Sequence, residues 1–295
     1  MLSTLTTPES APASRRRLPL WYWILIGGLV LVMALTAYPA FTQHPHQPGI
    51  GDFFPAPIFG EGTLFEFNRL TLNRLVMAAI VCAVLLLGAR KLAMVPGRGQ
   101  ALLEIIADFI RGNIAREMLG RIRGNQHAPF LTTVFLAVFF MNVAGILPGL
   151  NIAASSVIAV PLVFALYTYV TFIWAGIKEQ GVGHFLHSQL FPPGLPAPMY
   201  ILITPIEFLS VFIVRPVTLT LRLLCNMIAG HLLLAMTYFG TAVLLHELSS
   251  MTILASLTGV AMMVMTGFEV FVAVLQAYIF TILSAVYIKL SVESH

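Results

Sequence analysis

The stretch that decides the fold is ILITPIEFLSVFIVRPVTLTLRLLCNMIAGHLLLAMTYFG, residues 201–240. Such a long, nearly unbroken apolar segment is typical of a membrane helix, and its lysines and arginines number only two, Arg215 and Arg222. A charged side chain at bilayer depth costs at least ~2.5–3.5 kcal/mol. Arg222 therefore needs a partner, a water-filled cavity or a moving charge to offset that cost, and its function depends on what it faces.

The composition indicates an all-α polytopic membrane protein. Hydrophobic residues make up 58% of the chain and charged residues only 9%, whereas soluble domains carry roughly 25% charged residues. The net charge is +4, but no basic patch is interleaved with aromatic residues, which argues against nucleic-acid binding. We find no nucleotide-binding glycine loop and no paired-cysteine motif, so we expect no cofactor and no metal site.

Windows of about 20 apolar residues predict six membrane spans, at about 18–39, 70–88, 129–147, 156–176, 201–240 and 251–290. The last two would each be ~60 Å long if fully helical. This is about twice a perpendicular span, so these helices must tilt, break or curve. Residues 101–119 repeat apolar positions every three to four residues between charged ones, which predicts an amphipathic helix in the interface plane.

The distribution of lysine and arginine predicts that both termini are cytoplasmic. With the N-terminus inside, the outer loops 40–68, 148–155 and 241–250 contain neither residue, and the inner segments hold 12 of the 16. We expect residues 1–60 to form a tail, an extra membrane helix and an outer loop, and residues 61–295 to form the main membrane domain. The arginine-rich start of the first span also resembles a signal peptide, although its apolar core is longer than usual.

The polar residues of the fifth span lie along the helix in order. Arg215 and Arg222 are two turns apart and share a face, with Asn226 one turn beyond. His231 lies about 13 Å past Arg222, and Glu207 lies ~22 Å from it toward the cytoplasm. Pro216 is expected to loosen the helix between the two arginines.

The sixth span carries Glu269 and Gln276, seven residues apart on one face. If Gln276 is level with Arg222 in an antiparallel pair, Glu269 lies about 10 Å further out, near His231. A carboxylate beside an imidazole accepts protons near neutral pH, whereas an arginine keeps its proton. Titratable groups would then lie on both sides of a permanent cation.

Other interpretations of these residues stay open at this point. Arg215 could extend its head group to the interface, and Asn226 and Gln276 could bond neighbouring helices. Arg222 could form a static ion pair with Glu269 in a structural scaffold. It could also bind an anionic solute in a secondary transporter, although that class usually shows internal repeats, which we do not detect.

The chain resembles subunit a of the F-type ATP synthase over roughly residues 60–295. The most specific match is RPVTLTLRLLCNMIAGH (215–231), followed by LQAYIFTILSAVYI (275–288). Weaker matches are VPGRGQALLEII (95–106), FFMNVAGILPG (139–149) and IKEQGVG (177–183).

The resemblance implies a stator subunit of the proton channel in a bacterial cell membrane. It binds no ATP and works with the c-ring, the b subunits of the peripheral stalk and other ATP synthase subunits. Arg222 matches the essential arginine that faces the ring, and Asn226 and Gln276 match polar residues near it. His231 and Glu269 match the pair of the outer half-channel, but many relatives carry the acid first and the histidine second. The extra first span also departs from the usual five.

Overall fold

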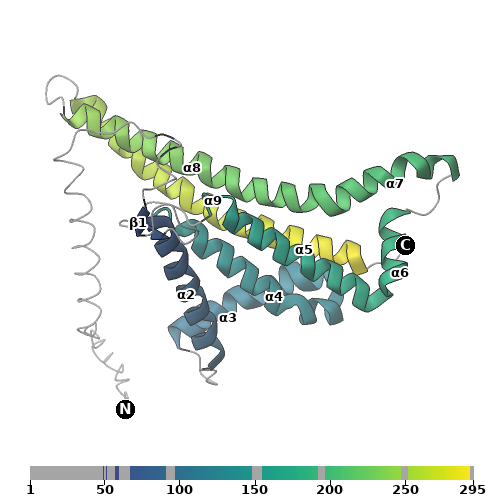
Figure 1. Ribbon diagram of the computed structural model, residues 1–295. Coiled ribbons are helices and arrows are strands. Elements are labelled where there is room, and N and C mark those ends of the chain that lie inside the picture. Colours follow the sequence, from purple (N-terminus) through teal and green to yellow (C-terminus); the bar gives the residue numbers. More distant parts are fainter. Residues whose placement is uncertain are drawn as a thin grey trace, which may run out of the picture. The chain divides into compact units, whose positions relative to one another are not determined.

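The computed structural model describes residues 49, 51, 57–59, 67–90, 97–147, 155–191, 197–246 and 252–292, all within one compact unit, His44–His295. Two short antiparallel strands, β1 (Pro57–Phe59) and β2 (Phe67–Asn68), precede the helices. The helices are α2 (Arg69–Arg90), α3 (Arg98–Ile110), α4 (Glu117–Val143), α5 (Ala159–Gln180), α6 (Val182–Leu190), α7 (Tyr200–Leu209), α8 (Arg215–His246) and α9 (Thr252–Val292) (Figure 1). Short 3₁₀ and π-helical segments join some of them: η2 (Arg111–Arg116), η3 (Ala197–Met199) and η4 (Ser210–Val214).

The predicted class, an all-α polytopic membrane protein, is confirmed. Four helical stretches are long and apolar enough to cross a bilayer: Gly99–Val143, Ala159–Gln180, Tyr200–Leu244 and Ser256–Val292. A shorter apolar helix covers Leu70–Leu86. These stretches include the second to sixth predicted spans, and the last two are long as expected. The first predicted span, with its signal-peptide alternative, lies outside the described residues.

The predicted amphipathic helix folds back on the third span. At Gly120 the backbone adopts φ 76° and ψ 174° inside α4, a conformation that glycine tolerates without a Cβ penalty. Beyond this turn Gly124 packs so closely that an added Cβ would lie 2.6 Å from the carbonyl oxygen of Ala115. One face of the amphipathic segment is buried through Ile110 and Ile114. Its other face is exposed, and its position in a membrane interface stays a prediction.

The core that positions the candidate site is formed by α4, α5, α8 and α9. Ala273, Ala277, Thr281 and Ser284 of α9 are small and fully buried, and small residues let membrane helices approach closely. In one cluster, Ala277 and Phe280 of α9 pack against buried residues of α4, α5 and α8. These residues are Val134, Val138, Ala165, Leu219 and Leu223. The helix α9 therefore packs against three others, and α8 covers one of its sides along much of its length (Figure 1).

The last turn of α9 is capped by glutamine side chains from α5 and α6. The Nε2 of Gln189 donates to the carbonyl oxygen of Leu290 at 3.0 Å, and the Nε2 of Gln180 donates to that of Ser291 at 3.2 Å. Carbonyl groups in a helix's last turn have no partner within the helix. These two bonds satisfy such groups and tie this end of α9 to its neighbours.

The irregularity caused by Pro216 lies on the other side of Arg215 from the one we expected. The helix is continuous from Arg215 onward, and the preceding segment, Ser210–Val214, is π-helical. Pro216 has no N–H to donate to the carbonyl four residues earlier, at Phe212. Because that carbonyl lies within Ser210–Val214, the wider turns form there rather than between the two arginines.

Candidate functional site

The candidate site lies along the antiparallel pair α8–α9. A hydrogen bond joins the helices near the middle of α8, where the Nδ2 of Asn226 donates to the Oε1 of Gln276 at 2.7 Å. Gln276 is almost fully buried. The face of α8 that packs on the core is marked by Leu219, Leu223 and Met227, buried at intervals of four residues. This packing fixes which side chains of α8 point away from the protein.

Arg222 points away from the core, on an exposed stripe of α8. Leu221 before it and Cys225 one turn later are exposed too. No ion pair or hydrogen bond joins Arg222 to another of the residues that the structure describes. The static pair with Glu269 is therefore not formed between these two described side chains. Arg222 is therefore an exposed cation whose charge no other described residue offsets.

Glu269 is buried on α9, the other helix of the pair. Its side chain is 3% exposed, and neither carboxylate oxygen has a hydrogen-bond partner among the described residues. It lies against Gly230, where an added Cβ would be 3.7 Å from its Oε1. An unpaired carboxylate is costly to bury. Glu269 is therefore less costly to bury when it is protonated or in contact with water.

The structure places the predicted outer pair, His231 and Glu269, at about the same level along α8 and α9. His231 follows Gly230 directly and is half-buried, so Glu269 lies beside the turn of α8 that carries His231. The expected level of Gln276 was wrong by one turn. It bonds Asn226 rather than lying beside Arg222, a displacement of about 6 Å along the helix.

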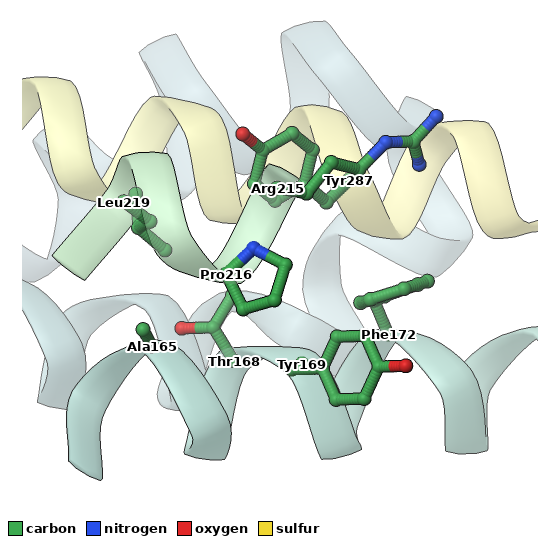
Figure 2. Close-up of a pocket in the computed structure, with 8 residues that line it drawn as sticks. All are labelled: Ala165, Thr168, Tyr169, Phe172, Arg215, Pro216, Leu219 and Tyr287. Atoms are coloured by element: carbon green, nitrogen blue, oxygen red, sulfur yellow. The ribbon is translucent and has the colours of Figure 1, made fainter. Parts of the chain in front are cut away.

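The part of the site at the start of α8 contains Arg215, and Glu207 precedes it on α7. The guanidinium carbon of Arg215 lies 5.6 Å from the centre of the Tyr287 ring on α9, a cation–π arrangement. Figure 2 shows the two side chains next to each other, beside a shallow crevice between α5, α8 and α9 that is too narrow to hold a water molecule. Glu207 is half-buried on α7, just before the π-helical segment.

Two residues of the site were missed at the level of sequence. Gly230 and Tyr287 both lie within the recognised motifs, but neither carries a charge that draws notice. Tyr287 could have been found from spacing, because eleven residues separate it from Gln276 and eleven separate Arg215 from Asn226.

The fold and the site together define a multi-pass helical membrane protein that carries ionisable groups within its two longest helices. The model of the ATP synthase A chain family matches residues 71–289. The chain is 39% identical to ATP synthase subunit a of Rhodococcus erythropolis over 250 residues, 84% of this chain and 91% of the relative. It is 40% identical to the subunit a of Frankia alni over 247 residues, 83% and 82% of the two chains.

A similar match, 36% identity over 242 residues, relates it to the subunit a of Gluconobacter oxydans, covering 81% of this chain and 94% of that one. The chain belongs to the ATP synthase A chain family. It is thus a membrane subunit of an F-type ATP synthase, and other subunits of that complex are its partners.

Proposed function

We propose that this chain is the proton-channel stator subunit of the Fo sector. It forms two half-channels that pass protons to and from carboxylates on the c-ring and so drive the rotation coupled to ATP synthesis. The observation that carries the proposal is the position of Arg222. It is an exposed cation on an apolar stripe of α8, with no partner among the described residues. A ring of acidic membrane helices is the kind of partner that offsets the cost of this charge.

In the proposed mechanism, protons enter from outside past His231 and Glu269. Glu269 suits this role because it is buried, unpaired and adjacent to the turn that carries His231. One proton neutralises a carboxylate of the ring, which can then turn into the lipid. After rotation, another ring carboxylate loses its proton on the inner side, near Glu207. Arg222 attracts the resulting carboxylate.

Arg222 also separates the two half-channels, with Asn226 and Gln276 orienting the same region of the helix pair. Arginine keeps its proton at accessible pH, so it blocks a direct path without relaying protons. One charge crossing 100 mV corresponds to ~2.3 kcal/mol, and a leak past Arg222 would dissipate all of it. We place the protein in the bacterial cell membrane with both termini in the cytoplasm. The c-ring and the b subunits of the peripheral stalk are its direct partners.

The test is ATP-driven proton pumping by the complete complex in vesicles, followed with a pH-sensitive dye. Arg222→Ala should reduce pumping at least tenfold while the amount of this subunit in the complex stays normal. The matched control is Arg121→Ala, because Arg121 is also exposed but lies just beyond the Gly120 turn. It should retain pumping within twofold. Unchanged pumping in Arg222→Ala would overturn the proposed function.

A further inference from the structure

Two contacts with α9 hold α8 on either side of Arg222. Four residues beyond Arg222, Asn226 bonds Gln276 at 2.7 Å. Seven residues before it, the guanidinium of Arg215 lies 5.6 Å from the Tyr287 ring centre. Since eleven residues separate the two contacts on each helix, both belong to one antiparallel register. Arg222 cannot rotate about the axis of α8 without disturbing both of them.

The helical backbone alone does not hold the inner end of α8 in this orientation. The segment immediately before Arg215, Ser210–Val214, is π-helical, and Pro216 supplies no N–H. Backbone hydrogen bonds span four residues in an α-helix and five in a π-helix, and a slip of one residue rotates everything beyond it by ~100°. Such a rotation would turn Arg222 off the exposed stripe. A contact with another helix is therefore needed to select one rotational orientation of α8.

The Arg215–Tyr287 contact is placed to make that selection. Arg215 is half-buried, and its Nη1 is buried with no hydrogen-bond partner among the described residues. The ring of Tyr287 is therefore the partner that the structure assigns to this cation. Figure 2 shows Tyr287 beside Arg215 at the start of α8, with Pro216 and Leu219 on the same helix and Tyr169 and Phe172 of α5 facing them. A cation–π contact of a half-buried arginine favours one orientation of the helix by roughly 5- to 30-fold.

We propose that Arg215 and Tyr287 are positioning residues that set the rotation of α8 and thereby aim Arg222 at the c-ring. This inference rests on the proposed function. Neither residue touches the transferred proton; both act through Arg222. Loss of their contact should leave the subunit assembled but misdirect Arg222, so that protons pass between the half-channels without turning the ring.

The experiment compares Tyr287→Leu with Tyr287→Phe in the complete complex in vesicles. Phenylalanine keeps the ring face and removes only the hydroxyl. Tyr287→Phe should pump within twofold of the native complex. Tyr287→Leu should lose at least fivefold in pumping and gain passive proton leak, with normal subunit content. Arg215→Lys, which keeps a cation for the ring, should retain more pumping than Arg215→Met.

A second measurement reports the rotation of α8 directly. Cys225 is exposed three residues beyond Arg222, so its disulfide cross-linking to a series of cysteines in the c subunit follows the orientation of this face. Tyr287→Leu should lower the yield or shift the best position, and Tyr287→Phe should not. Equal pumping and cross-linking in the two variants would overturn the inference, as would a loss of pumping that merely follows subunit loss. Failure of the proposed function is seen separately, as pumping that survives Arg222→Ala.

Discussion

Gly176 of α5 is the position where one added methyl group should cost the most stability. A Cβ there would lie 2.6 Å from ring carbons of the buried Phe185 on α6 and would also collide with the Oγ of Ser291 on α9. Carbon atoms in good contact are about 3.5–4.0 Å apart, so the helices must separate by about 1 Å. Overpacking of this kind typically costs ~1–3 kcal/mol. Disturbing the bond from the Ser291 hydroxyl to the Phe172 carbonyl adds ~1 kcal/mol.

Replacing glycine by alanine inside a helix raises the free energy of unfolding by up to ~1 kcal/mol. The net loss expected for Gly176→Ala is therefore about 1–3 kcal/mol, which corresponds to a melting temperature several degrees lower. The measurement is thermal unfolding of the purified complex, scored by the fraction of this subunit that remains folded and bound.

The control is Gly183→Ala on α6, where an added Cβ meets nothing within 4 Å. This variant should be as stable as the native protein or slightly more stable. If Gly176→Ala proved no less stable than Gly183→Ala, the close packing of α5, α6 and α9 described above would be incorrect.

Three further predictions concern other contacts. Gly230→Ala should be tolerated, because the added Cβ would lie 3.7 Å from Glu269, an ordinary contact. Gly230→Leu should displace Glu269 and reduce ATP-driven pumping at least fivefold. Equal pumping by the two variants would contradict this prediction. Gln189→Leu removes a hydrogen bond that caps α9 and should lower the free energy of unfolding by about 1 kcal/mol, measured in the same thermal assay. Unchanged stability would show that this bond does not stabilise the end of α9. In the intact complex, cysteines placed in the c subunit should form disulfides with Cys225 and not with Cys82, although both are exposed in this chain. A non-reducing gel showing the reverse would mean that the ring does not lie against the Arg222 face of α8.

The positions of the membrane helices could be predicted from the sequence because hydrophobicity follows from composition alone. The apolar run around Arg222 and the small number of charges predicted long membrane helices, and the structure has them. The local effect of Pro216 was misplaced. The missing N–H of a proline leaves the carbonyl four residues earlier without its bond, so the irregularity falls before Arg215.

Pairing between helices was predicted with an error of one turn. Counting residues placed Glu269 near His231 but set Gln276 against Arg222 instead of Asn226. The offset between two antiparallel helices depends on how their side chains interlock, and here small residues such as Ala273 and Ala277 on α9 allow a close approach. The spacing within either helix alone does not contain that information.

The sequence by itself determined that the chain lies in a membrane, which family it resembles and which polar residues are candidates for the site, because transfer of charge into lipid is costly wherever it occurs. Only the tertiary structure decided which way those residues point. Packing of Leu219 and Leu223 into the core turns Arg222 outward and leaves Glu269 buried against Gly230. Orientation is a property of the contacts between helices, and those contacts exist only once the helices have packed.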